Sequence, residues 1–397
     1  MFSRIHANMK ILIAISYFQP DIGYAESKLA EQLTAQGHTV EVVTSNYYFP
    51  FPDFSSSVSS VLPSRSVKPG RKRLNGYWIN RKKQLFEIFA RSLFFGVSDD
   101  LTRFQPNIVL AFGVTAPITL QLAQLKKDYK YKLFAIDSHL PSELESGNRF
   151  VKHVFYYFFR QVFSNFLNKN LDRVIALQEA TKGIIKNVYG ISKSVQLIPH
   201  GSDLNEFNFD KKARTKIRLA NNWNEQDFVI IYTGKVIPSK GIELLFKAFN
   251  SLLNGGYKVR LLIVGDGSRE YTDECLSFLE VKYHQNVRWQ GFIKQSLLYK
   301  YYSAADVAVW PLQESLAMND AAACMLPFIA NDQIGATLRV SNKNALLYTQ
   351  GDSNDLATKI EYLYKHSSAR KKMGQRGREL IEQKLSWQKL ATRFIDG

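Results

Sequence analysis

The sequence predicts an α/β protein built from two doubly wound domains that face a crevice. Its 397 residues suffice for two domains of ordinary size. Short apolar runs typical of buried strands alternate with stretches of helical periodicity, and this alternation begins twice, near residue 10 and again near residue 228. Strands that alternate with helices indicate parallel sheets, which bind ligands beyond the carboxyl ends of their strands.

The first run opens with the apolar segment 10–16, which predicts a buried parallel strand. Apolar positions at helical spacing follow over 25–36, and Gly37 ends this helix as a C-terminal glycine does. Further strands are predicted at 38–45, 107–112, 131–136 and 173–177, with a short apolar segment at 195–199.

The second run contains strands predicted at 228–232, 259–264, 286–289, 307–310 and 328–330, with a helix over 242–253. We therefore place the first domain at 1–203 and the second at 204–382. We expect a C-terminal helix at about 383–397 to pack back on the first domain.

The composition, with 45% apolar and 22% charged residues, is ordinary for a globular protein and excludes a collagen, a coiled coil and global disorder. Cys275 and Cys324 are the two cysteines, so a disulfide framework is not expected and a reducing compartment is the default. No apolar stretch is long enough for a transmembrane helix, and the first residues do not resemble a signal peptide. These observations predict a cytoplasmic protein.

The charge is strongly basic, with 52 Lys and Arg against 35 Asp and Glu, and the excess is larger in residues 1–200 than in the rest. This balance suggests an anionic partner: nucleic acid, anionic lipid or a phosphorylated substrate. Two segments break the strand–helix pattern: 65–91 is rich in basic residues, and 149–171 is basic and crowded with aromatics. They form either a solvated loop and a core helix, or a basic amphipathic surface on an anionic membrane.

Two loops at predicted strand ends are suited to phosphate binding. Gly23 lies in the first strand–helix loop, where glycine lets the backbone approach a phosphate closely, although no GxGxxG pattern is present. In the loop 232–241, Gly234 permits a tight turn, and Lys235 and Lys240 could hold a diphosphate without a metal. A plain turn glycine and two solvated lysines are the simpler interpretations.

Two further loops carry acids and a histidine. Glu314 and Asp320 follow the strand at 307–310, and carboxylates suit the hydroxyl groups of a sugar or ribose, although Asp320 could also cap a helix. His139 follows the strand at 131–136. A lone histidine is usually structural, but this one is predicted to face the same crevice.

Seven short motifs, in order along the chain, resemble glycosyltransferase family 4. They are the opening strand with Gly23 and the turn at Gly37, the segments 172–176 and 198–207, Gly234-Lys235 through Lys240-Gly241, the glycines Gly265 and Gly267, and 304–306 before the Glu314 loop. The resemblance covers nearly the whole chain. It implies a retaining enzyme with two Rossmann-like domains, the architecture called GT-B.

The resemblance also implies roles for individual residues. Lys235 and Lys240 would hold the donor diphosphate, Glu314 would lie near the donor sugar, and His139 would lie beside the reacting sugar, so these four are the catalytic residues implied. Asp320 would bind ribose hydroxyls, and the segment at Gly291 would line the base. The donor-binding residues implied are Gly23, Gly234, Lys235, Lys240, Gly291, Phe292, Glu314, Ser315, Leu316 and Asp320.

Three departures from the family pattern concern the donor. Lys235 stands where the family usually has an arginine. A lysine lacks the forked, bidentate geometry of a guanidinium. Five residues rather than seven separate Glu314 from Asp320, and the second acid is the shorter one. Met325 stands where glycine is common. These departures leave the donor sugar and a reduced activity as open questions; because both acids and Pro327 remain, we expect a short-loop variant of the motif.

The function implied is transfer of a sugar, with retention, from a nucleoside diphosphate sugar to a lipid-linked or cell-surface glycan, as in lipopolysaccharide, O-antigen or capsule assembly. Neither a metal nor another cofactor is implied, and nucleic acid is not an expected partner, because it would explain the charge but not the loops. The protein is expected to sit peripherally at the inner face of the cytoplasmic membrane. The alternatives are a catalytically inactive glycosyltransferase-like binding partner and a nucleotide-sugar epimerase of the same fold.

Overall fold

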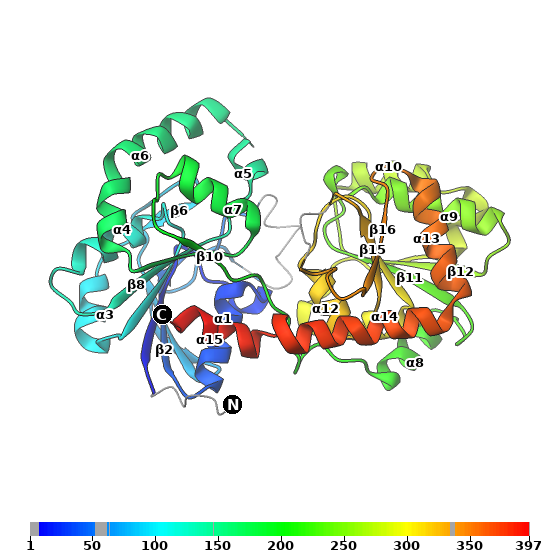
Figure 1. Cartoon of the computed structure of the whole chain (residues 1–397), viewed down its shortest axis with the longest axis horizontal. Helices are drawn as coiled ribbons and strands as arrows, with labels where there is room; N and C mark the ends of the chain where they lie inside the picture. Colours follow the sequence, from blue (N-terminus) through cyan, green and yellow to red (C-terminus); the bar gives the residue numbers. More distant parts are fainter. Residues whose placement is uncertain (1–7, 52–61, 63, 146, 334–337, 397) are drawn as a thin grey trace. The chain divides into compact units, whose positions relative to one another are not determined.

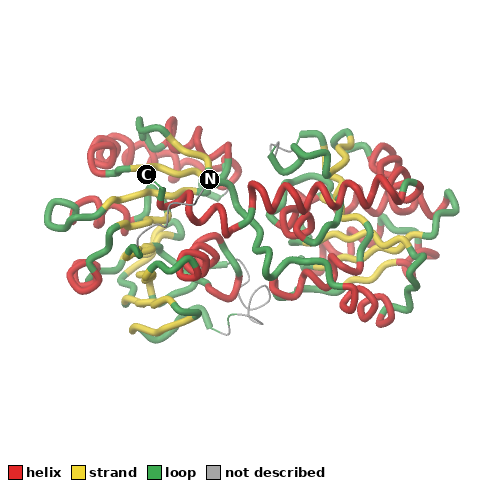
Figure 2. The backbone as a smooth tube through the Cα atoms, turned by 60° about the horizontal axis from the view of Figure 1, so that its bottom comes forward, coloured by secondary structure: helices red, strands yellow, loops and turns green. Residues whose placement is uncertain are grey.

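The computed structural model describes residues 8–51, 62, 64–145, 147–333 and 338–396 (Figure 1). The chain divides into two compact units. The first contains the residues up to His200 together with those from Trp387 on, and the second contains Gly201–Ser386. In each unit strands lie at the centre with helices around them (Figure 2).

The described strands of the first unit form an eight-stranded sheet with the order β10-β9-β8-β7-β1-β2-β4-β3. All neighbours pair in parallel except β3 and β4. The strands are β1 (Lys10–Ala14), β2 (Thr39–Ser45), β3 (Gly70–Leu74), β4 (Tyr77–Lys82), β7 (Ile108–Phe112), β8 (Lys132–Asp137), β9 (Arg173–Ala176) and β10 (Val195–Leu197).

Helices cover both faces of this sheet. One core contains Leu12 and Ala14 of β1, and the other contains Ile11 and Ile13, because successive side chains of a strand point to opposite faces. The helices are α1 (Ala25–Ala35), α3 (Val97–Phe104), α4 (Pro117–Leu125), α5 (Pro141–Glu145), α6 (Arg149–Asn170), α7 (Glu179–Gly183) and α15 (Trp387–Ile395), with short helices η1 (Pro20–Ile22) and η2 (Ile184–Val188). The sequence prediction of a C-terminal helix beside the first domain corresponds to α15, whose Trp387 and Phe394 lie in the core with Leu29 of α1.

The basic segment 65–91 is not a solvated loop, because its described residues extend the sheet. β3 and β4 form an antiparallel hairpin around Asn75-Gly76, both at positive φ, and a second hairpin joins β5 (Phe86–Ile88) to β6 (Arg91–Leu93). Asn-Gly between strands is a strong hairpin signal that the sequence interpretation missed. Tyr77 and Ile79 point into the core, while the buried Glu41 of β2 accepts hydrogen bonds from Arg71 and Arg103.

The second unit is built on a six-stranded parallel sheet with the order β13-β12-β11-β14-β15-β16 among the described residues. The strands are β11 (Phe228–Thr233), β12 (Val259–Val264), β13 (Val287–Trp289), β14 (Val307–Trp310), β15 (Phe328–Asn331) and β16 (Ala345–Tyr348). The helices are α8 (Lys211–Ala220), α9 (Ile242–Asn254), α10 (Arg269–Ser277), α11 (Leu298–Ala304), α12 (Ala317–Ala323), α13 (Ser353–Lys365) and α14 (Ser367–Leu380), with short helices η3 (Pro238–Lys240), η4 (Val281–Asn286), η5 (Gln295–Leu297) and η6 (Ile381–Leu385). The apolar runs of the sequence therefore become parallel strands, which are buried in β11, β12, β14 and β15 but only partly buried in β13.

In the part of the chain that the structure describes, none of the helices is both long and apolar enough to span a lipid bilayer.

Glycine is required where α14 crosses α12. A β-carbon on Gly374 would lie 2.0 Å from the carbonyl oxygen of Met325, just beyond α12. We predict that Gly374→Ala destabilises the second unit by about 1–3 kcal/mol, because the helix must move away from that carbonyl. Urea or thermal unfolding of the full chain measures this.

The matched control is Gly183→Ala, also at a helical position, where an added β-carbon meets nothing within 4 Å. Alanine favours a helix, so this variant should unfold at or above the wild-type midpoint. Equal midpoints for the two variants would contradict the close α14–α12 contact.

Candidate functional site

Three loops at the carboxyl end of the second sheet are held together by glycine backbone. A β-carbon on Gly265, after β12, would lie 1.8 Å from the carbonyl oxygen of Gly234, after β11. One on Gly267 would lie 2.0 Å from the carbonyl oxygen of Val236. Gly265 also donates its N–H to the carbonyl oxygen of Gly291, after β13, at 2.8 Å. The predicted residues Gly234 and Gly291 therefore belong to one backbone cluster.

The loop after β11 presents both predicted lysines. Gly234 has φ of +142°, a conformation that favours glycine, and the Tyr232 hydroxyl donates to the carbonyl oxygen of Lys235 at 2.7 Å. The Lys235 side chain is exposed and Lys240 is half-buried at the end of η3. Neither lysine forms an ion pair within the described residues.

Burial and charge both act on Lys240. Its Nζ lies 3.4 Å from the carbonyl oxygen of Glu314. Desolvation lowers the pKa of Lys240, the nearby charge of Lys235 lowers it further, and Glu314 opposes this shift. Two mutually repelling ammonium groups beside a sheet end are relieved when an anion binds between them.

The Glu314 side chain forms an ion pair with a buried arginine. Nε of Arg339 lies 3.0 Å from Oε1 of Glu314, and the same guanidinium donates to the carbonyl oxygen of Ser315 at 2.9 Å. Arg339 is buried, and Leu316 next to Ser315 is exposed. Sequence reasoning missed Arg339, since no local pattern connects it with a loop more than twenty residues earlier.

Asp320 lies inside α12 and only 5% of it is exposed. Its Oδ1 accepts a hydrogen bond from the Ser202 hydroxyl at 2.7 Å, and its Oδ2 lies 3.3 Å from Nε2 of Gln295. The structure thus connects Asp320 with the segment at 198–207, another of the motifs from the sequence. Met325, at the position where the family commonly has glycine, adopts φ of +58°, the left-handed conformation that favours glycine.

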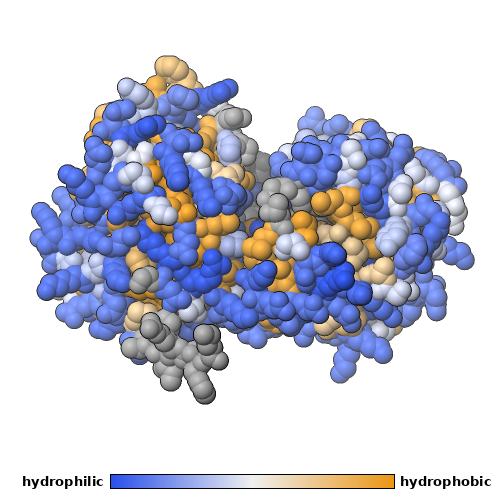
Figure 3. All heavy atoms as spheres, viewed as in Figure 1, coloured by the Kyte–Doolittle hydropathy of each residue, from blue (hydrophilic) through white to orange (hydrophobic). Residues whose placement is uncertain are grey.

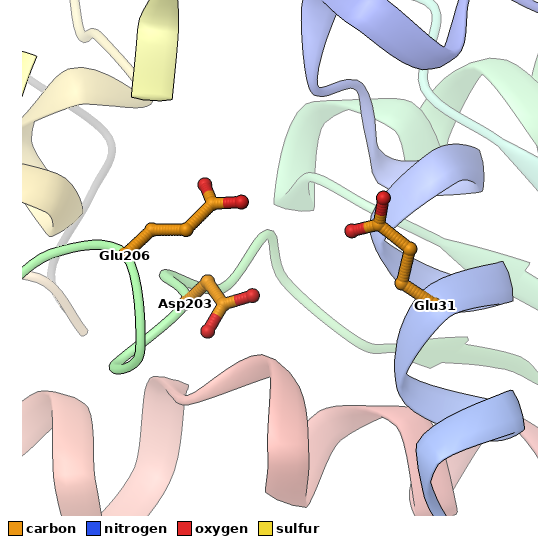
Figure 4. Close-up of side chains that lie close together, drawn as sticks. All are labelled: Glu31, Asp203 and Glu206. Carbon is orange, nitrogen blue, oxygen red and sulfur yellow. The ribbon is translucent and has the colours of Figure 1, made fainter. Parts of the chain in front are cut away.

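Asp203 and Glu206 follow Ser202 on the same loop of the second unit (Figure 4). The Asp203 carboxylate accepts a hydrogen bond from the Asn205 N–H at 3.0 Å, and the backbone carbonyl oxygen of Asp203 accepts one from the Phe207 N–H at 2.8 Å. Both hydrogen bonds stabilise the turn that contains Asp203. Phe292 follows Gly291 and is exposed, beside the backbone cluster formed by the three loops.

In the first unit, Gly23 ends η1 with φ of +79°, directly before α1. The helix has no side-chain cap at Tyr24. Glu26 lies in its first turn, and burial raises the pKa of this carboxyl to about 7. Gly23 therefore adopts a backbone conformation that favours glycine, in the loop between the first strand and the first turn of α1. The sequence predicts a glycine loop at this place.

His139 is fixed by Asp137 at the carboxyl end of β8. The Asp137 carboxylate accepts the His139 backbone N–H at 3.0 Å and lies 2.7 Å from Nδ1 of the imidazole. Its other oxygen accepts the N–H of Val114 at 2.9 Å. The charge of Asp137 raises the pKa of His139, against the opposing effect of burial. Sequence reasoning named the histidine but gave Asp137 no role.

Two family models match the chain in succession. The model described as Glycosyltransferase Family 4 matches residues 27–206, and the model described as glycosyl transferases group 1 matches residues 213–380. Together they span most of both units.

Curated relatives are similar at low identity. CapM of Staphylococcus aureus, a capsular polysaccharide biosynthesis glycosyltransferase, is 27% identical over 233 residues, which are 56% of this chain and 60% of CapM. A GDP-mannose-dependent monoacylated alpha-(1-6)-phosphatidylinositol monomannoside mannosyltransferase of Corynebacterium glutamicum is 25% identical over 305 residues, 72% of this chain and 74% of the relative. The chain thus spans less than two thirds of the length of CapM.

Solved structures share the fold over almost the full length. Sucrose-phosphate synthase from Thermosynechococcus elongatus has a TM-score of 0.70 at 19% identity and 97% coverage of both chains. Anabaena Alr3699/HepE, solved with UDP and glucose, has a TM-score of 0.68 at 17% identity and 98% coverage of both chains. The two family models show that the chain belongs to the family-4 type glycosyltransferases, and the solved structures show that it has the GT-B fold.

Proposed function

We propose that this protein transfers a sugar, with retention, from a nucleoside diphosphate sugar to a lipid-linked or cell-surface glycan. The observation that carries the proposal is the loop cluster at the carboxyl end of the second sheet, where Lys235 and Lys240 meet no carboxylate partner among the described residues. CapM acts in capsular polysaccharide biosynthesis and HepE was solved with UDP and glucose, which supports the same class of donor and acceptor.

The donor diphosphate would be held by Lys235, Lys240 and the loop N–H groups around Gly234. Negative charge accumulates on the diphosphate as the sugar leaves, and two ammonium groups stabilise it more in the transition state than in the ground state. Glu314, held beside Arg339, would accept hydrogen bonds from hydroxyl groups of the donor sugar. The leaving phosphate would take the acceptor proton on the same face, so no protein nucleophile is needed.

His139 would act from the first unit. Asp137 keeps the imidazole oriented through Nδ1, so Nε2 is the nitrogen that could donate to an oxygen of the reacting sugar. Because Asp137 raises the pKa of His139, the imidazolium form extends to higher pH than in a free histidine. We assign His139 to positioning and charge stabilisation rather than to nucleophilic attack.

The acceptor would be presented at an anionic membrane surface, at the inner face of the cytoplasmic membrane. Helix α6 carries apolar side chains on both faces: Tyr156, Phe159 and Leu167 lie in the core, whereas Phe150, Tyr157 and Phe158 are 77%, 66% and 59% exposed. Figure 3 shows hydrophobic residues, in orange, interspersed with hydrophilic ones, in blue, in the part of the first unit where Figure 1 places α6. Exposed apolar side chains interspersed with cations such as Arg149 and Arg160 favour contact with an anionic lipid surface.

The β5–β6 hairpin continues this surface. Phe89 beside the hairpin and Phe155 of α6 have ring centroids 5.2 Å apart, and the hairpin region exposes Leu85, Phe86 and Ile88. Exposed cations elsewhere in the first unit, Lys72 and Arg73 of β3 among them, would add attraction to anionic lipid.

A catalytically inactive binding partner is the second candidate. The buried Asp320 already bonds to Ser202 and Gln295, so ribose hydroxyls would compete with protein groups for its oxygens. Such a protein would bind nucleotide without turning over a nucleotide sugar. The release of nucleoside diphosphate separates the two candidates.

Lys240→Ala should reduce both donor binding and turnover. We expect a loss of about 2–4 kcal/mol of transition-state stabilisation, or roughly 30- to 900-fold in kcat/KM, because a charge-assisted contact to the leaving group disappears. Calorimetric titration with UDP and GDP measures binding, and release of nucleoside diphosphate from the sugar nucleotide that binds measures turnover.

Lys216→Ala is the control, since this lysine is exposed on α8. It should retain wild-type affinity and rate. A Lys240→Ala protein with near wild-type turnover would refute the diphosphate assignment, provided circular dichroism shows both variants folded.

Turnover should persist in EDTA. The two lysines and the loop N–H groups would supply the positive charge that a divalent ion provides in other transferases. The measurement is the rate of nucleoside diphosphate release before and after dialysis against chelator. A complete loss that magnesium restores would contradict metal independence.

Binding to liposomes should depend on both charge and α6. Triple reversal of the exposed residues Lys72, Arg73 and Lys83 to Glu should weaken co-sedimentation with anionic vesicles, since each cation near such a surface contributes about 1 kcal/mol. The α6 double variant Phe150→Ser and Phe158→Ser should weaken it at every salt concentration, because apolar insertion is not screened.

The control reverses three exposed lysines of the second unit, Lys216, Lys258 and Lys371, and should bind as the wild type does. Equal binding to neutral and anionic vesicles would remove the electrostatic part of the proposal. Unchanged binding of the α6 variant would remove the insertion part.

A further inference from the structure

A cavity of about 490 Å³ lies in the second unit beside the edge strand β16. Its walls come from β16, from the turn that precedes this strand and from helices α13 and α14. Leu346, Leu347 and Met373 supply aliphatic surface, and Tyr362 of α13 supplies an aromatic ring. The volume falls within the range of small-molecule sites, about 300–1,000 Å³. None of the residues assigned to the donor lines it.

The charge of the cavity is uniformly positive. Lys343, Lys372 and Arg376 line it, and none of the lining residues that the structure describes is acidic. These three cations form no ion pair with any described residue, and the first turn of α14 carries no acid. Three cations around one cavity, with no acid among its described lining residues, favour an anionic ligand, and a phosphate group is the ordinary one.

The turn before β16 holds Lys343 in place at the rim. Lys343 adopts φ of +53°, a conformation that side chains rarely take. Two amide side chains secure the turn: Asn342 donates to the carbonyl oxygen of Arg376 at 2.8 Å, and Asn344 donates to that of Arg339 at 2.8 Å. The turn is therefore tied to α14 on one side and to Arg339 on the other.

We propose that this cavity is an effector site for a small organic phosphate with an apolar or aromatic body. The three cations would take the phosphate, and Leu346, Leu347, Met373 and Tyr362 would cover the body. Apolar walls distinguish this ligand from inorganic phosphate, which has no surface to bury against them.

Two contacts made by residues next to the cavity lining reach the loop that we assign to the donor. The assignment of that loop rests on the proposed function. Arg339, directly before the lining residue Val340, holds Glu314 and the carbonyl oxygen of Ser315. Helix α14 also bears on α12, since Arg378 donates to the carbonyl oxygen of Ala323 at 2.9 Å. A ligand that tightens the turn or α14 would change the placement of Glu314 and α12, and so the affinity for the donor.

Calorimetric titration of the full chain with phenyl phosphate tests the site. We expect binding that weakens about tenfold in Lys372→Glu and in Arg376→Gln, the effect of losing one charge-assisted contact. Lys343→Gly should weaken it similarly without strain, because glycine accepts the positive φ. Inorganic phosphate should bind more weakly than phenyl phosphate.

Two controls separate this site from the donor site. Lys371→Glu changes an exposed neighbour on α14 that does not line the cavity, and it should leave binding within twofold of wild type. Lys240→Ala should also retain it. The site is refuted if phenyl phosphate does not bind, if Lys371→Glu weakens binding as much as Lys372→Glu, or if only Lys240→Ala abolishes it.

The effector role is tested by the affinities for UDP and GDP, measured with and without saturating phenyl phosphate. We expect the affinity of the nucleotide that binds to change about fivefold or more, and the change to vanish in Lys372→Glu. An unchanged affinity in the wild type overturns the effector role. If neither nucleotide binds, uridine and guanosine donors are excluded and the effector role on them fails, while the phenyl phosphate titration alone decides whether the cavity is a binding site.

Discussion

The close approach of Gly234 and Gly265 is the constraint on which the second unit's site depends. A side chain at Gly265 would overlap the Gly234 carbonyl, and one at Gly267 would overlap that of Val236, so the loops after β11 and β12 can meet only as bare backbone. Gly265 then reaches Gly291 after β13. Because these contacts join three strand ends, they determine where Lys235 emerges and where η3 begins.

Glu314 and Asp320 both contact other side chains, whereas Lys235 and Lys240 form no ion pair with any described carboxylate. Arg339 neutralises Glu314, and Ser202 and Gln295 bond to Asp320. Lys235 and Lys240 keep a local positive charge at the sheet end, and the lowered pKa of Lys240 reflects the cost of holding that charge partly out of water. An anionic ligand removes this cost, which is the physical basis for assigning the diphosphate to these lysines.

The first unit shows a different imbalance, between apolar surface and the neighbours available to cover it. Helix α6 uses Tyr156, Phe159 and Leu167 for the core and still exposes a second apolar stripe. The adjoining β5–β6 hairpin exposes more of the same kind. The packing of the sheet does not require this exposed apolar surface. Contact with a lipid bilayer would cover it. The same unit carries the larger share of the basic excess, which suits an anionic surface.

The sequence by itself determined the class of fold, its two runs of strands and the family, because buried parallel strands and glycine turns are local patterns of a few residues. The core strands of both units lie where the apolar runs predict them. The Asn75-Gly76 pair is a local signal of the β3–β4 hairpin. The sequence analysis missed it because the many basic residues of the segment suggested a solvated loop. Only the tertiary structure decided that Arg339 holds Glu314 and that Ser202 holds Asp320, 118 residues away. Such pairings arise from packing between elements distant in the chain, and no periodicity or spacing encodes which polar groups the folded sheet brings within hydrogen-bonding distance.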